Sequence, residues 1–223
     1  MRDWAKKQRA IMENSVYTET LQSLPNAALQ NIDASYDRFI GQLNTVAACA
    51  GSEMSKDKIA KAAAKRDEIC RLADKLNAFS IPNTLCHGDI RPGNICEKNG
   101  VFLLYDWGMS LYAHPFYDIC HLLHVVRREM SEPDRERILT AYLQEWTDFA
   151  PMEALLEAYT TIDRLKFFIF VYMDCEWVMQ ILNACQKIPQ YSLDNWLLTK
   201  RLYYLNRVFD RFVGIHVEQI NVM

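Results

Sequence analysis

The chain has 223 residues, of which 50% are hydrophobic, and its 25 basic and 28 acidic side chains give a net charge of −3 at pH 7. This length and composition predict one compact domain, and the balanced charge gives no reason to expect a nucleic acid or a membrane as partner. The seven cysteines form no C-x-x-C pair and the N-terminus lacks the apolar core of a signal peptide, so we expect reduced thiols and a cytoplasmic location.

The N-terminal 86 residues predict helices. Apolar residues recur with helical spacing over 2–22 and 33–50, and a third helix is predicted from about Ser55 to Phe79. This region has no G-x-G-x-x-G motif, no Walker A sequence and no Val-Ala-Ile-Lys strand. It therefore lacks the loop and the lysine with which kinases hold nucleotide phosphates.

The segment that follows carries the most informative motif. A short strand is predicted at 84–86, followed by His-Gly-Asp at 87–89 and by Asn94, five positions after Asp89. Pro-Gly at 92–93 favours a tight turn between these two side chains. The spacing equals that of kinase catalytic loops, in which the aspartate accepts a hydroxyl proton and the asparagine binds a metal ion. Asp89 is therefore the candidate catalytic base.

A β-hairpin is predicted directly after this loop. Residues 94–97 and 101–105 have the pattern of two strands, and Asn-Gly at 99–100 suits the connecting turn. Such a hairpin would bring Asp106, the first residue of an Asp-Trp-Gly triplet, back beside Asn94. Amide and carboxylate oxygens are ligands that Mg²⁺ accepts, so these two residues are the predicted site for the metal and its nucleotide phosphates.

The remainder of the chain predicts further helices. One helix is expected at 116–130, and Pro133 and Pro151 should each mark the start of another. Residues 152–187 form either one long helix or two with a bend, and 193–213 is the last predicted helix. The longest apolar run of the chain, within 152–187, is far shorter than the ~20 residues of a membrane span.

Asp118, His121 and His124 recur every three residues in the predicted helix 116–130. Three such side chains on one helical face could bind a metal ion. Zinc sites, however, usually take ligands from more than one element and have second-shell support. We therefore interpret the two histidines as buried or capped structural residues.

Residues 84–124 resemble the aminoglycoside phosphotransferase and choline kinase group of small-molecule kinases, whose signature is H-G-D-x-x-x-x-N followed by D-W or D-F. The resemblance implies a mainly α fold with a small central β-hairpin, namely the C-terminal lobe of a protein-kinase-like fold. It implies that Asp89 is the catalytic base and that Asn94 and Asp106 hold Mg²⁺ with ATP or GTP. Asp118 would brace the catalytic loop from the following helix.

Other side chains take roles around this centre. His87 is interpreted as a support of the loop, because Asp89 already fills the role of base. For Arg91 two readings stay open: a contact to the γ-phosphate, which the resemblance suggests, or an exposed loop arginine.

The resemblance also places acceptor recognition on the helices after Pro151. Asp174 and Glu176 could meet a cationic acceptor, and Trp177 could flank a quaternary ammonium group. The alternative is that the aromatic ring is part of the core and the carboxylates lie on the surface.

The sequence as a whole predicts one helical lobe over 1–223, with the catalytic loop and metal site at 84–108 and an acceptor-binding region at 151–213. Its expected function is ATP-dependent transfer of a γ-phosphate to the hydroxyl of a small molecule, such as an aminoglycoside or choline. The nucleotide-binding N-terminal lobe is absent, which argues against activity of the chain alone. Two alternatives therefore stay open: a non-catalytic kinase-like binding module, or half of a split enzyme completed by a partner chain.

Overall fold

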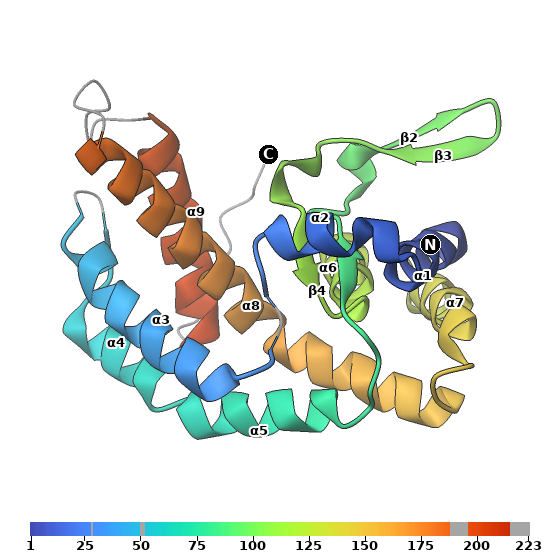
Figure 1. Cartoon of the computed structure of the whole chain (residues 1–223), viewed down its shortest axis with the longest axis horizontal. Coiled ribbons are helices and arrows are strands. Elements are labelled where there is room, and N and C mark those ends of the chain that lie inside the picture. The colour runs from blue at the N-terminus through green and yellow to red at the C-terminus, as the bar shows by residue number, and fades with distance from the viewer. Residues whose placement is uncertain (28, 50–51, 188–195, 215–223) are drawn as a thin grey trace. The chain divides into compact units, whose positions relative to one another are not determined.

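The computed structural model describes residues 1–27, 29–49, 52–187 and 196–214 (Figure 1). Most of these residues are helical, and the strands among them form two small antiparallel sheets. The prediction of a mainly α fold with a small β-hairpin is confirmed. The chain divides into two compact units, one made of Met1–Gln30 and Leu72–Lys166 and the other of Asn31–Arg71 and Phe167–Met223. That the two units form the single predicted lobe stays a prediction.

The first unit contains the short strands and the helices around them. In chain order its helical elements are α1 (Arg2–Glu13), η1 (Ser15–Tyr17), α2 (Thr18–Ser23), the end of α5 (Arg66–Asn77), α6 (Phe116–Val125), η4 (Val126–Arg128), α7 (Glu132–Leu143), η5 (Gln144–Trp146) and the beginning of α8 (Met152–Lys187). Its core includes the rings of Phe116, Tyr142 and Trp146, which lie in edge-to-face or tilted contact with centroids 5.8–6.3 Å apart.

Two sheets of two strands position the loop between them. β1 (Thr84–Cys86) pairs with β4 (Leu111–Ala113), and β2 (Ile95–Lys98) pairs with β3 (Val101–Leu104). The predicted hairpin is confirmed as β2–β3: Asn99 and Gly100 both have positive φ, as the tight turn requires. Two further 3-10 turns, η2 (Pro92–Asn94) and η3 (Trp107–Met109), flank the hairpin.

The second unit is helical. It contains α3 (Ile32–Ala47), α4 (Lys56–Ala63), the beginning of α5, the rest of α8, and α9 (Trp196–Phe212). Four aromatic rings form its centre: Tyr36 stacks on Phe168 with centroids 5.2 Å apart, and Phe39 and Phe212 pack against Phe168 edge-on or tilted. The Tyr36 hydroxyl is satisfied by donating to the Ala62 carbonyl at 2.6 Å.

Two predicted helices are interrupted. The single helix predicted over 2–22 is wrong, because Asn14 is extended and its side chain accepts the Val16 N–H, which starts η1. The single helix predicted from Ser55 to Phe79 is also wrong: it breaks after Ala63, and the new helix begins at Arg66.

Two further predicted helices are shorter than expected. The helix predicted over 116–130 ends at Val125 and is followed by η4, and the one predicted over 33–50 ends at Ala47.

Other predicted features hold. Pro133 and Pro151 do mark helix starts, and 152–187 is one continuous helix. The first residues of the predicted helix 193–213 lie outside the described residues. In the described part of the chain no helix combines the length and the apolar character needed to cross a bilayer.

Candidate active site

The candidate catalytic loop leaves β1 through a glycine that no other residue could replace without strain. Gly88 has φ +82°, and a Cβ at this position would lie 2.0 Å from the Met109 carbonyl oxygen. The loop therefore passes against the backbone that leads into β4. This close approach fixes the direction in which Asp89 leaves the strand.

The buried carboxylate of Asp118, on α6, holds the start of this loop. It accepts hydrogen bonds from the backbone N–H groups of His87 (2.9 Å) and Gly88 (3.0 Å). The Trp4 indole N–H at 2.9 Å and the Gln8 amide at 3.5 Å, both on α1, donate to the same carboxylate. Burial raises the pKa of Asp118, and the bonds from Gly88, His87 and Trp4 partly oppose this effect.

The contacts from α1 could not be found from the sequence. Trp4 and Gln8 lie more than 100 residues before Asp118, and they belong to no motif. Only the structure shows that Gln8, on an amphipathic helix, has no exposed surface and therefore needs buried hydrogen-bond partners.

His87 ties the loop to the hairpin. Its Nε2 lies 3.0 Å from the Tyr105 carbonyl oxygen, and its Nδ1 accepts the Asp89 N–H at 3.3 Å. This pattern requires the proton on Nε2, so the ring is held in one tautomer. The ring centroid is also 4.6 Å from that of Trp107. These contacts agree with a supporting role, and none joins His87 to the Asp89 carboxylate.

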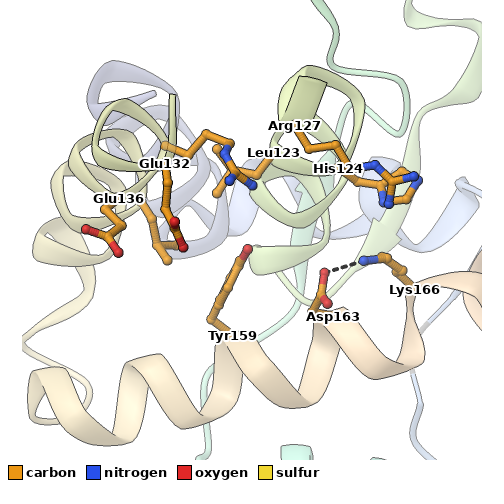
Figure 2. Close-up of a pocket in the computed structure, with 10 residues that line it drawn as sticks. Leu123, His124, Arg127, Glu132, Glu136, Tyr159, Asp163 and Lys166 are labelled. Carbon is orange, nitrogen blue, oxygen red and sulfur yellow. Dashed lines mark hydrogen bonds and ion pairs between the residues drawn. The ribbon is translucent and has the colours of Figure 1, made fainter. Parts of the chain in front are cut away.

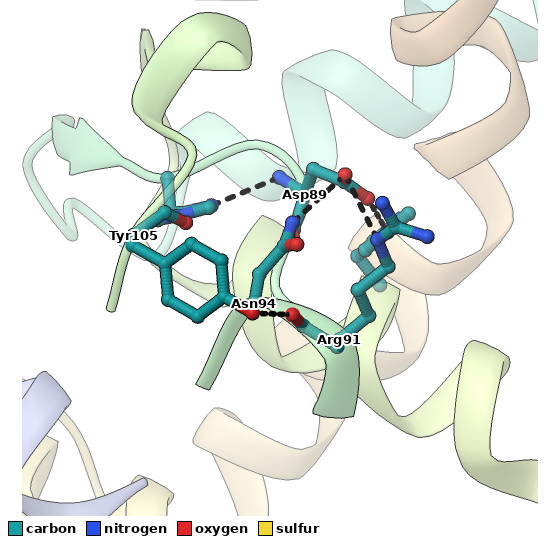
Figure 3. Close-up of polar contacts among 7 residues, drawn as sticks. Asp89, Arg91, Asn94 and Tyr105 are labelled. Carbon is teal, nitrogen blue, oxygen red and sulfur yellow. Dashed lines mark hydrogen bonds and ion pairs between the residues drawn. The ribbon is translucent and has the colours of Figure 1, made fainter. Parts of the chain in front are cut away.

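The Asp89 carboxylate is held by three side chains (Figure 3). Its Oδ1 lies 3.2 Å from His121 Nε2, and its Oδ2 accepts from Asn94 Nδ2 at 3.0 Å and from Arg91 Nε at 3.2 Å. Partial burial would raise the pKa of Asp89, but the hydrogen bond and charge of His121, the charge of Arg91 and the Asn94 hydrogen bond outweigh it and lower the pKa. The carboxylate is therefore ionised at neutral pH.

His121 is a site residue that the sequence interpretation missed. The sequence predicts a structural role for this histidine, whereas its Nε2 contacts the carboxylate of the candidate base. The spacing from Asp118 was the available signal, because a residue one turn after the brace of the loop points to the same side of α6.

Arg91 is half-exposed and forms an ion pair with Asp89. This position is compatible both with a contact to the γ-phosphate and with an exposed loop arginine. A contact to a phosphate therefore stays a prediction.

At the base of the hairpin the backbone that leads into Asp106 returns beside Asn94. The Tyr105 N–H donates to the Asn94 carbonyl at 3.1 Å, and the Tyr105 hydroxyl donates to the Gly93 carbonyl (Figure 3). Asp106 follows directly in the left-handed region, with φ 64° and ψ 60°, and its side chain is exposed. This conformation costs a non-glycine residue roughly 1–2 kcal/mol.

This donor set fits a magnesium ion that also binds phosphates. The Asn94 amide nitrogen donates both of its bonds to Asp89, which leaves the amide oxygen for a cation. Among the described residues no group of three or more His, Cys, Asp or Glu side chains could hold a metal ion. One carboxylate and one amide are few ligands for an all-protein site, but Mg²⁺ usually keeps waters and phosphate oxygens as its other ligands.

The predicted acceptor residues lie in the second unit, on α8. Asp174 is buried, its Oδ1 is 3.3 Å from Arg201 Nη1, and burial raises its pKa to about 7 although Arg201 opposes the shift. Glu176 accepts from Gln42 at 3.1 Å and lies 3.5 Å from Arg38. Asp174 is thus not on the surface.

Trp177, the third predicted acceptor residue, is partly buried. Its ring lies 4.8 Å below the Arg201 guanidinium. An acceptor role for these three residues stays a prediction.

Two solved structures resemble the chain weakly. An ethanolamine kinase of Plasmodium vivax is 15% identical, with a TM-score of 0.44, and the match covers 93% of this chain and 58% of the kinase. A spectinomycin phosphotransferase solved with ADP and spectinomycin is also 15% identical, with a TM-score of 0.39, and the match covers 96% of this chain and 64% of the phosphotransferase. The chain therefore spans less than two thirds of either structure.

A search of curated proteins found no match. A family model described as the phosphotransferase enzyme family, APH, matches residues 18–155, which is more than half of the chain and contains the catalytic loop, the hairpin, Asp118 and His121. The chain belongs to the phosphotransferase enzyme family.

Proposed function

We propose that this chain is the catalytic and acceptor-binding part of an ATP-dependent phosphotransferase that moves the γ-phosphate to a hydroxyl of a small molecule. The observation that carries the proposal is the arrangement around the hairpin. The candidate base Asp89 is hydrogen-bonded to the candidate metal ligand Asn94, and the hairpin returns Asp106 to the same place. Membership in the phosphotransferase family supports the same chemistry.

The chain's own residues would act by position and charge. The Asp89 carboxylate takes the acceptor's hydroxyl proton as that oxygen forms its bond to the γ-phosphorus and the bond to the bridging oxygen of the nucleotide breaks. His121 and Asn94 hold the two carboxylate oxygens in place. Arg91 would release Asp89 and pair with a phosphate oxygen. Mg²⁺ held by Asn94 and Asp106 would neutralise charge on the phosphates.

For the acceptor we propose a cationic small molecule, supported by side chains of the second unit. Asp174 and Glu176 offer carboxylates and Trp177 offers an aromatic face, a set that suits an amino alcohol or an aminosugar. In the described structure all three are engaged by Arg201, Arg38 or Gln42, so a cationic acceptor would have to compete with these partners.

The test is an activity assay on the longest natural polypeptide that contains this chain. ADP release from ATP and Mg²⁺ is measured with a panel of amino alcohols and aminosugars, for the wild type, Asp89→Asn and Asp57→Asn. We expect a fall of about 10²-fold or more for Asp89→Asn, because the variant loses the proton acceptor. Asp57 is an exposed carboxylate whose one ion pair among the described residues is with Lys61, and its substitution should leave turnover unchanged. Equal activity of Asp89→Asn and the wild type would sink the assignment.

A second candidate is half of a split enzyme. It is favoured by the β2–β3 hairpin, where Val101, Phe102 and Leu103 are 42–65% exposed. Apolar side chains in such a row are typical of surfaces that other protein covers. Acceptor-dependent ADP release that requires a second, β-rich chain would favour this alternative.

A further inference from the structure

The first unit contains a polar pocket that the proposed reaction does not use. It lies between α6, α7 and the beginning of α8, and its volume is about 270 Å³. Figure 2 shows Tyr159, Asp163 and Lys166 projecting from α8 toward the other two helices. None of the residues that line the pocket belongs to the catalytic loop or the hairpin. The volume is slightly below that of sites for drug-sized ligands, roughly 300–1,000 Å³, and suits a small metabolite.

One arginine in the pocket, Arg135, has unmet hydrogen-bonding capacity. Arg135, on α7, has a buried Nε–H without a hydrogen-bond partner. Within the described residues, no ion pair joins Arg135 or Arg127, at the end of η4, to a carboxylate. A buried charged donor without an acceptor costs free energy. An acceptor that enters the pocket would recover this cost.

The lining carries as many acidic as basic side chains, but one acid–base pair is already formed within it. Asp163 is already paired with Lys166 at 2.5 Å, so these two charges offset each other. Burial, with smaller effects from Cys120 and Asp163, raises the pKa of Tyr159, so its hydroxyl stays protonated and can donate.

The other two acidic side chains of the pocket, Glu132 and Glu136, are exposed on α7, where solvent screens them (Figure 2). They therefore offset the charge of the half-buried Arg135 less than a buried carboxylate would, whereas the exposed Arg127 is screened as they are.

We propose that this pocket binds a small oxyanion, the carboxylate or phosphate group of a metabolite, through Arg135, Arg127 and the Tyr159 hydroxyl. Guanidinium groups pair with both kinds of anion by charge-assisted hydrogen bonds. A bare metal cation is disfavoured here, because the pocket's one partly buried carboxylate, Asp163, already has a lysine partner. This proposal does not depend on the proposed phosphotransfer. No residue that lines the pocket takes part in that reaction, and anion binding can be measured without turnover.

The test is a titration of the chain with inorganic phosphate and with acetate at constant ionic strength, in the absence of Mg²⁺ and nucleotide. Backbone amide NMR shifts of 123–127 and 159–166 report binding in the pocket. We expect saturable shifts there, and a loss of affinity of about tenfold or more in Arg135→Gln. Stronger binding of phosphate would identify a phosphorylated ligand, and stronger binding of acetate a carboxylate.

Matched variants keep this test decisive. Arg137 lies on the same helix with its side chain 82% exposed, so Arg137→Gln should leave the affinity within about twofold. Arg135→Lys keeps the charge but loses the Nε–H, and it replaces Arg135→Gln if circular dichroism shows that the glutamine variant does not fold. Arg91→Gln, run in parallel, identifies phosphate held at the catalytic loop. The proposal is overturned if no saturable shift occurs in the pocket, or if Arg135→Gln and Arg135→Lys both bind as the wild type does.

Discussion

At the scale of single residues, the protonation of Asp89 depends on its three neighbours. Burial alone would raise the pKa of this carboxyl, and it is lowered because His121, Arg91 and Asn94 all favour the charged form. A base that is deprotonated but partly desolvated can accept a proton from a hydroxyl without competing strongly for protons from water. His121 is the neighbour whose effect can be separated, because it contributes both a hydrogen bond and a charge.

We predict that His121→Leu raises the pKa of Asp89 and that His121→Gln raises it less, since glutamine can still donate a hydrogen bond. The measurement is a pH titration of the Asp89 carboxyl carbon by NMR in the three proteins. In the complete enzyme the same change would move the acidic limb of the pH–activity profile to higher pH. An Asp89 pKa that does not change in His121→Leu would show that the ring does not control this carboxylate.

The sequence was informative at this scale where residues are close along the chain. Asp89, Asn94 and Asp106 were found because a turn and a hairpin fix their relation within 18 positions. His121 and Gln8 come from helices whose packing no local pattern specifies.

At the scale of elements, the segment between β1 and β2 shows how one position can be closed to substitution while a near neighbour is open. Gly88 combines a positive φ with contact to the Met109 backbone, whereas a Cβ at Gly93 would meet no atom within 4 Å. Both glycines belong to the same loop and precede or follow the candidate base closely. They form a matched pair for testing whether the loop conformation depends on close backbone approach.

We predict that Gly88→Ala lowers the free energy of unfolding by on the order of 3 kcal/mol or more, because the methyl group clashes with a carbonyl that belongs to the backbone and cannot rotate away. Gly93→Ala should change it by less than about 1 kcal/mol. Urea denaturation followed by circular dichroism measures both values. Similar losses in the two variants would mean that the approach of Gly88 to Met109 is not tight in solution.

Element boundaries were predicted well where the sequence carries a stop or start signal, as at Pro133, Pro151 and the Asn-Gly turn at 99–100. They were missed where tertiary contacts interrupt a continuous apolar period. The break before Arg66 is an example: there the arginine turns to pair with Asp33 and Asp37, both at 2.9 Å. Helical spacing continues through this break, so periodicity cannot reveal it.

At the scale of the whole molecule, the two units differ in what they bury. The first buries a carboxylate, Asp118, with four donors around it, so its charge is met on both oxygens. The second buries Asp174, whose Oδ1 faces Arg201 while its Oδ2 is buried without a hydrogen-bond partner. An ionised carboxylate in that position is costly, and the cost should appear as a dependence of stability on pH.

The sign follows from proton binding. Burial raises the pKa of Asp174 from 3.8 to about 7 in the folded protein, so between these values the folded state holds a proton that the unfolded state releases. Stability contributed by this group is therefore present below about pH 4 and is lost as the pH rises toward 7. At ~1.36 kcal/mol per pKa unit, the loss is on the order of 4 kcal/mol by pH 8.

We therefore predict that Asp174→Asn, which resembles the protonated acid, matches the wild type in unfolding free energy near pH 4 and exceeds it by a few kcal/mol near pH 8. Urea denaturation at intervals across this range measures the difference between the two proteins, which cancels the titration of all other groups. Asp57→Asn is the control, because this exposed carboxylate of the same unit should contribute less than about 0.5 kcal/mol at any pH. If the difference for Asp174→Asn stays constant with pH, the Arg201 ion pair compensates the buried charge fully. Asp174 would then be ionised at neutral pH as a structural partner of Arg201, and its pKa would not be raised.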